Sequence, residues 1–113
     1  VVNNATLSFN RSNSLTVANA LSGSGAVVQQ GSGTLVLTGA NSYSGGTTVS
    51  AGTLQGNATS LQGNIVNNAA VVFDQTGSGT YAGVMSGTGS LTKQNTGTLV
   101  LTGANSYSGG TTV

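Results

Sequence analysis

The sequence contains no cysteine, proline, histidine or tryptophan, and only three of its 113 residues are charged: Arg11, Asp74 and Lys93. The absence of cysteine excludes a disulfide framework and thiolate metal sites. Two cations far apart in the chain cannot neutralise the several phosphates on which nucleic-acid binding depends, so we expect no nucleic-acid partner. The longest apolar run, residues 69–73, is far shorter than the roughly 20 residues of a membrane helix, so we expect no membrane insertion by this segment.

The shortage of ionisable side chains also argues against catalysis. Glycoside hydrolysis normally uses two carboxylates, and this chain has only Asp74. General acid–base catalysis most often uses histidine, which is absent. Serine is so common here that a serine near Lys93 carries no information about a Ser–Lys pair. The sequence therefore predicts no enzyme, with no catalytic, cofactor-binding or metal-binding residues and no cofactor.

An internal repeat is the most prominent feature that is present. The segment GTLVLTGANSYSGGTTV occupies residues 33–49 and returns unchanged at residues 97–113. Of residues 1–49, 29 are identical to the residue 64 positions later. A fixed period of this kind is typical of array architectures. We therefore expect a first repeat unit at residues 1–64 and a truncated second unit at residues 65–113, joined in one continuous solenoid.

Strands are favoured over helices throughout. The chain has 19 glycines, and glycine, serine, threonine, asparagine and valine all disfavour helix. Short alternating runs such as TLVLT at 34–38 are separated by glycine-containing turns. A β-sandwich gains nothing from internal identity, whereas a β-solenoid stacks equivalent coils about 4.8 Å apart. The sequence predicts an all-β, parallel β-helix with about 21 residues per coil, three coils per 64-residue repeat (roughly 2–22, 23–43 and 44–64) and about five coils in all.

The alternation assigns a direction to individual side chains. Thr34, Val36 and Thr38 are expected to face solvent. Glycines at the turns are expected where the backbone needs a positive φ or a close approach, and asparagines at corners where they adopt the left-handed conformation or bond stacked neighbours. The residues expected in the structural core are Leu35, Leu37, Val49, Leu54, Phe73, Leu99 and Leu101, with Leu7, Phe9, Leu15, Val17, Val27 and Leu61 also pointing inward. The turn glycines are Gly39, Gly45, Gly46, Gly103, Gly109 and Gly110, and the corner asparagines are Asn3, Asn4, Asn41, Asn67, Asn68 and Asn105.

Two tyrosines recur at equivalent positions, Tyr43 and Tyr107. An exposed aromatic ring on a surface of hydroxyls and amides is a candidate ligand contact, because it stacks on a glycan. The alternative is that each ring packs against the turn of its own coil as a structural plug, and this alternative is the favoured one.

The segment SGTLVLTGANSYSGGTTVSAGTLQGN at 32–57 resembles the autotransporter-associated β-strand repeat, which occurs in the passenger regions of bacterial type V autotransporter adhesins. The second copy follows the same pattern from Gly97 to Val113. The resemblance implies a right-handed β-helix displayed outside a Gram-negative cell, with an N-terminal signal and an outer-membrane barrel elsewhere in the parent chain. The matching residues of the first copy are Gly33, Leu35, Leu37, Gly39, Asn41, Ser42, Tyr43, Ser44, Gly45, Gly46, Thr47, Val49, Gly52, Thr53 and Leu54.

These observations favour a structural role. We expect an extracellular β-helical stalk or passenger segment of an autotransporter adhesin, located at the cell surface or secreted, which supports surface display, adhesion or autoaggregation. The near absence of charge leaves little repulsion between copies, so self-association or contact with other cell-surface molecules is compatible with the sequence. The alternative is the repeating core of a self-assembling secreted filament or biofilm matrix fibre.

Overall fold

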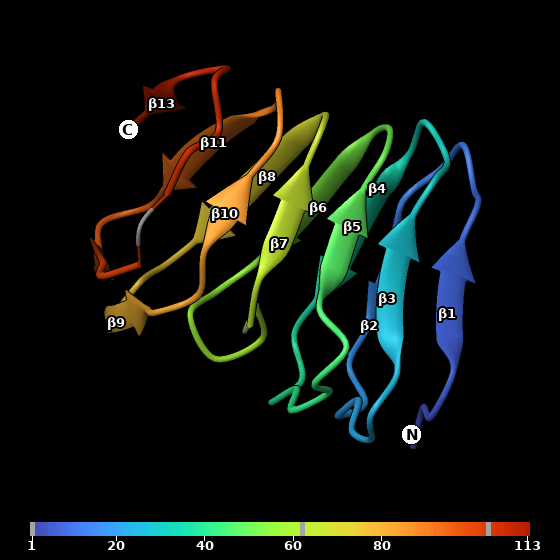
Figure 1. The fold of residues 1–113 in the computed structure, drawn as a ribbon. Helices are drawn as coiled ribbons and strands as arrows, with labels where there is room; N and C mark the ends of the chain where they lie inside the picture. The colour runs from blue at the N-terminus through green and yellow to red at the C-terminus, as the bar shows by residue number, and fades with distance from the viewer. Residues whose placement is uncertain (1, 62, 104) are drawn as a thin grey trace.

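Short parallel strands wind into a solenoid in the computed structural model, which describes residues 2–61, 63–103 and 105–113. The coils follow one another along the stack, and the N- and C-terminal ends lie at opposite ends of it (Figure 1). The molecule measures 31 × 25 × 24 Å, and its five-stranded sheet takes one strand from each of five coils. The described residues form no α-helix, hence none that is long and apolar enough to cross a bilayer. The predicted all-β solenoid of about five coils is confirmed.

Three parallel sheets form the sides of the solenoid, and the chain visits them in turn. The front sheet comprises β1 (Thr6–Phe9), β3 (Ala26–Gln29), β5 (Thr47–Val49), β7 (Ile65–Asn67) and β10 (Met85–Ser86). The back sheet comprises β2 (Leu15–Val17), β4 (Thr34–Leu37), β6 (Thr53–Gly56), β8 (Ala70–Asp74), β11 (Ser90–Gln94) and β13 (Thr111–Thr112). The side sheet comprises β9 (Ser78–Tyr81) and β12 (Thr98–Leu101), and in the first coils an isolated parallel bridge joins Val2 to Ser22.

The coils are close to the predicted length, but they are not all equal. Equivalent residues of neighbouring coils, such as Leu7 and Val27, lie 20 positions apart in the sequence. On the front sheet the same spacing would pair Thr47 with Asn67. Thr47 pairs with Ile65 instead, so the coil between these two residues is shorter than the others along this sheet.

Both connections of the short coil are compact. The link from β5 to β6, residues 50–52, is shorter than the link from β3 to β4, residues 30–33. Between β6 and β7 the chain makes a tight turn at residues 57–61. In this turn the Asn57 side chain accepts hydrogen bonds from two backbone amides, and the amide of Leu61 donates to the Asn57 carbonyl oxygen at 2.9 Å.

The 64-residue repeat consequently does not equal three coils. Three coils carry the front sheet from Leu7 to Ile65, whereas the repeat partner of Leu7 is Val71. Val71 lies in β8 of the back sheet, although Leu7 lies in β1 of the front sheet. In the same way β2 and β4 of the back sheet correspond to β9 and β12 of the side sheet. The prediction of three coils per repeat is wrong. Each repeat comprises three complete coils and, in addition, one of the three sides of the next coil.

Identical residues of the two repeats therefore do not stack directly on one another. Columns of inward side chains combine different residue types, as in the back-sheet column of Leu15, Leu35, Leu54, Val71 and Leu91. What the repeats preserve is the contact between neighbouring coils within one unit: β1 pairs with β3, and their counterparts β8 and β11 pair with each other. The front and back sheets continue across residues 64 and 65 without a break.

The interior contains most of the apolar side chains expected there. Of the expected core residues, Leu35, Leu37, Val49, Leu54 and Phe73 are buried, and Leu99 and Leu101 are half-buried near the C-terminal end. Val27 and Leu61 are buried, whereas the first-coil residues Leu7, Phe9, Leu15 and Val17 are half-buried because the described residues place no coil beneath them. The remaining buried apolar residues are Leu21, Tyr43, Ile65, Val71, Tyr81, Met85 and Leu91.

Candidate functional site

Buried amides hold neighbouring coils together on the inside of the solenoid. Asn41 is 2% exposed, and its Oδ1 accepts a hydrogen bond from the amide of Leu21 in the coil below at 2.8 Å. Its Nδ2 donates to the carbonyl oxygen of Ser60 in the coil above at 3.1 Å. One side chain thus connects three coils, and no buried side-chain nitrogen or oxygen of the described residues lacks a partner. Because both polar atoms of the Asn41 side chain are hydrogen-bonded, its burial avoids the free-energy cost of an unpaired polar group.

The second repeat reproduces the first of these bonds, and other asparagine bonds also recur between the two repeats. Asn105 Oδ1 accepts from the amide of Met85 at 2.8 Å, as Asn41 does from Leu21. Asn3 and Asn67 each donate from Nδ2 to a carbonyl oxygen 23 residues later, at 2.9 and 2.8 Å. Asn4 and Asn68 accept amide hydrogen bonds from residues 20 positions later.

Of the two reasons for placing asparagine at corners, bonding between stacked neighbours is present and a left-handed backbone is not. None of these asparagines has a positive φ, and among described non-glycine residues only Asn95 does. Sequence reasoning also missed Gln29, Asn41 and Asn67 as interior residues. The recurrence of asparagine at the 64-residue period beside apolar positions was the signal for two of them.

The two repeated tyrosines differ in burial but make the same hydroxyl contact. Tyr43 is 5% exposed, and its hydroxyl is 2.6 Å from the Thr47 hydroxyl. Tyr107 makes the same contact with Thr111 at 2.5 Å, but its ring is half-buried because it lies in the last coil. Because the Tyr43 ring lies inside the stack, it cannot offer its face to a glycan.

The predicted turn glycines lie at bends between strands. Gly46 and Gly110 have φ values of +85° and +88°, a region that side-chain-bearing residues avoid. A Cβ atom at Gly45 would overlap the carbonyl group of Gly25 in the coil below. The neighbouring backbone is equally close at Gly39, Gly103 and Gly109.

Alkaline pH is expected to destabilise the protein through its buried tyrosines. Burial raises the pKa of Tyr43, and the hydrogen bond to Thr47 partly offsets this rise. The pKa of Tyr81 is also raised, mainly by burial and to a smaller extent by the nearby Tyr43. Above pH 10.0, the ordinary value, tyrosines of the unfolded chain lose protons that the folded chain keeps, so the free energy of unfolding falls as the pH rises. Urea unfolding at about pH 9 and about pH 11 measures this.

Tyr43→Phe is the matched variant for this measurement, because it removes one titrating hydroxyl and keeps the ring. Its unfolding free energy should fall less steeply with pH than that of the parent. An unfolding free energy equal at both pH values in the parent protein would contradict the prediction.

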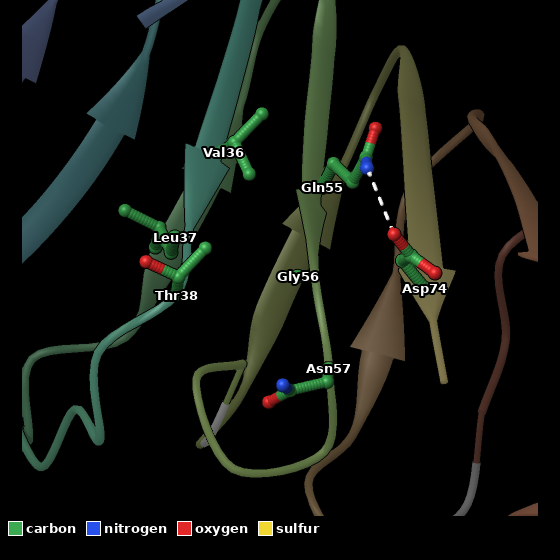
Figure 2. A pocket seen from close by; sticks show the side chains of 7 residues that line it. All are labelled: Val36, Leu37, Thr38, Gln55, Gly56, Asn57 and Asp74. Carbon is green, nitrogen blue, oxygen red and sulfur yellow. Dashed lines mark hydrogen bonds between the residues drawn. The ribbon is translucent and has the colours of Figure 1, made fainter. Parts of the chain in front are cut away.

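A shallow groove lies on the outside of the back sheet (Figure 2). Its volume is about 80 Å³, room for only two or three water molecules. The Asp74 carboxylate at its edge accepts hydrogen bonds from Gln55 Nε2, at 3.4 Å, and from Asn95 Nδ2. Among the described residues no three His, Cys, Asp or Glu side chains gather as a metal site would require. The groove lining comprises Val36, Leu37, Thr38, Gln55, Gly56, Asn57 and Asp74.

The repeated segments are similar to segments of known proteins. Residues 27–55 and 91–113 match the passenger-associated-transport-repeat family. The chain is also similar to an adhesin autotransporter, BmaC, of Brucella suis biovar 1 (strain 1330), with 56% identity over 55 residues. The similar region is 45% of this chain and 2% of that protein, so the chain spans a very small part of its relative. No solved structure matches the chain.

Both matched segments contain the motif on which the resemblance was based. Residues 27–55 include β4 and β5 with most of β3 and β6, and residues 91–113 include most of β11 with β12 and β13. Each segment therefore contributes strands to successive coils and contains the asparagine and the tyrosine described above. The predicted resemblance is confirmed: two segments of the chain match passenger-associated transport repeats.

Proposed function

We propose that this chain is a structural segment of an autotransporter passenger, a rod that holds other parts of its parent protein away from the surface of a Gram-negative cell. The continuity of the front and back sheets across the boundary between the two repeat units carries this proposal. Because the strands of one unit continue the sheets of the previous one, each added unit lengthens the rod and does not form a separate domain. The match to passenger-associated transport repeats supports the setting.

The length of the rod provides the test. Each 64-residue unit adds three coils and one further side, which at about 4.8 Å per coil is roughly 16 Å. We expect the maximum dimension from small-angle X-ray scattering to increase by this amount when a second copy of residues 50–113 is appended after Val113. An appended segment of the same composition in scrambled order is the control. A compact particle of unchanged maximum dimension would overturn the proposal.

Adhesion by the sides of the rod is the second candidate function. The printed name of the Brucella relative describes an adhesin, and the chain offers polar sides with only three charged residues. Cells that display only this region through an outer-membrane anchor separate the two candidates. Clumping of these cells, or binding to host cells, would favour adhesive sides. Dispersed cells would favour a spacer, and regular filaments of the purified chain in electron micrographs would favour the fibre alternative.

A further inference from the structure

The groove on the back sheet marks a gap in a column of outward side chains (Figure 2). Thr38 follows β4 and Asp74 ends β8, and both residues line the groove. Between these strands lies β6, whose last residue, Gly56, pairs with Phe73. The next residue, Asn57, would therefore continue the column beside Asp74. The Asn57 side chain instead accepts hydrogen bonds from the backbone of the turn that follows it, and this leaves the hollow between Thr38 and Asp74.

The groove contains Asp74, which is the only carboxylate side chain of the sequence. Amide side chains from the coils on either side orient it. Gln55 Nε2 donates to Oδ2 at 3.4 Å, and Asn95 Nδ2 donates to Oδ1. A carboxylate oxygen accepts about two hydrogen bonds, so each oxygen can accept one more. The carboxylate is thus preorganised, which lowers the ordering cost of binding a ligand.

The ligand that this carboxylate suits is neither a cation of the same chain nor a metal ion. Arg11 Nε donates to Asn13 in the connection after β1, and Lys93 Nζ donates to the carbonyl oxygen of Asn95 at 2.9 Å. A calcium ion takes about six to eight oxygen ligands, usually with several carboxylates among them, and the sequence supplies one carboxylate. The two oxygens of Asp74 are therefore acceptors for neutral or cationic donors that a ligand brings.

The other groups that line the groove suit a ligand with both polar and apolar surface. The Thr38 hydroxyl can donate and accept, and the Gln55 carbonyl oxygen can accept. Val36 adds methyl groups beside these polar atoms. The volume of about 80 Å³ admits two or three water-sized groups, which matches one edge of a sugar ring and not a whole ring. A sugar presents adjacent hydroxyls on such an edge and C–H groups on its face.

We propose that this groove is a binding site for a saccharide, which it holds by two adjacent hydroxyl groups. The hydroxyls donate to the two carboxylate oxygens of Asp74, and the ring carbons lie against Val36. Hydrogen bonds to an ionised acceptor are roughly twice as strong as neutral ones, so Asp74 supplies most of the affinity. Because only an edge of one sugar is held, a single sugar binds with a millimolar dissociation constant. The inference goes beyond the proposed rod function and does not depend on it.

The direct test titrates the ¹⁵N-labelled protein with the methyl glycosides of glucose, galactose and mannose and follows the backbone amides by NMR. We expect at least one glycoside to cause saturable shifts confined to the groove, at residues 36–38, 55–57 and 74. The 3-deoxy form of that glycoside has no two adjacent ring hydroxyls, so it should cause no saturable shift.

Two variants test the role of the carboxylate. Asp74→Asn keeps the shape of the side chain but removes its charge and one acceptor oxygen, so it should weaken binding roughly 10-fold or more. Asn10 is the repeat partner of Asp74 and lies outside the groove. Asn10→Asp places a carboxylate at the equivalent position of the first repeat and should leave binding unchanged. Circular dichroism spectra equal to that of the parent protein establish that both variants fold.

Saturable shifts at the groove that need adjacent hydroxyls and weaken in Asp74→Asn support the proposal. Equal affinity of Asp74→Asn and the parent protein, or equal shifts with the 3-deoxy form, would overturn it. It is also overturned if none of the three glycosides causes saturable shifts at roughly 0.1 M, far above a millimolar dissociation constant. Binding of methylguanidinium but of no glycoside would overturn it in favour of a site for basic side chains.

Discussion

Leu35→Asp is expected to abolish the cooperative unfolding transition of the central coils. Leu35 is 1% exposed and lies between Leu15 and Leu54 in the back-sheet column. A carboxylate at this position has no cationic partner, and an unpaired buried charge costs several kcal/mol. That loss is comparable to the roughly 5–15 kcal/mol that stabilises a typical domain. Circular dichroism during heating and during urea titration measures the effect.

Two control variants separate burial from sequence. Thr34→Asp places the same charge on the opposite side of β4, half-exposed, and should change the unfolding free energy by less than about 1 kcal/mol. Leu99→Asp changes the equivalent residue of the second repeat, which lies in the last coil and is half-buried. We expect Leu99→Asp to loosen β12 and β13 and to leave the transition of the earlier coils in place. Equal losses for Leu35→Asp and Leu99→Asp would contradict the stacked arrangement.

Phe73→Ala is expected to lower the free energy of unfolding by about 3–5 kcal/mol, the usual range for deleting a buried aromatic ring. Phe73 is 0% exposed, and its ring centroid lies 5.5 Å from that of Tyr81 in a tilted arrangement. The substitution removes this ring pair and leaves a cavity that the surrounding strands cannot easily close, because their backbones are fixed by hydrogen bonds on both sides. Urea denaturation followed by tyrosine fluorescence gives the measurement.

The repeat partner Phe9 provides the matched control for this substitution. Phe9 is half-buried in the first coil, where its neighbours cover it from one side only. Phe9→Ala should therefore cost clearly less than Phe73→Ala, although the residue type and the repeat position are the same. A larger loss for Phe9→Ala would mean that the first coil is covered and the coil of Phe73 is not, contrary to the fold.

The sequence was sufficient to predict an all-β solenoid, strands such as that within residues 34–38, and the family resemblance. Alternation in TLVL places Leu35 and Leu37 inside β4, and recurrence of the motif indicates stacking. The length of each coil could not be predicted in the same way, because a repeat period states how often a pattern returns and not how many turns it contains. The shortening of one coil depends in part on the turn at Asn57, whose side-chain hydrogen bonds are local and leave no mark on the period.

The polar interior was only partly predictable. Gln29 is 2% exposed and donates from Nε2 to the carbonyl oxygen of Gly33 at 3.0 Å, four residues on. Its position after two valines indicates a strand, but no pattern in the sequence shows that the amide finds a backbone partner inside. The repeat partner of Gln29 is Lys93, which donates to the Asn95 carbonyl oxygen at 2.9 Å. Such substitutions between repeats are tolerated where the side chain reaches a local acceptor. The handedness of the coil stays a prediction from the resemblance.

The one-side advance of each repeat has a mechanical consequence for any longer array of such units. After one repeat a motif that began on the front sheet lies on the back sheet, and the back-sheet motif lies on the side sheet. Three consecutive repeats would return the motif to its starting side. Over such an array, each of the three sides therefore contains every part of the repeat in turn, and no side is built from one part alone. Bending stiffness is then nearly equal in every direction, and anything carried on one flank of the motif is presented all around the circumference.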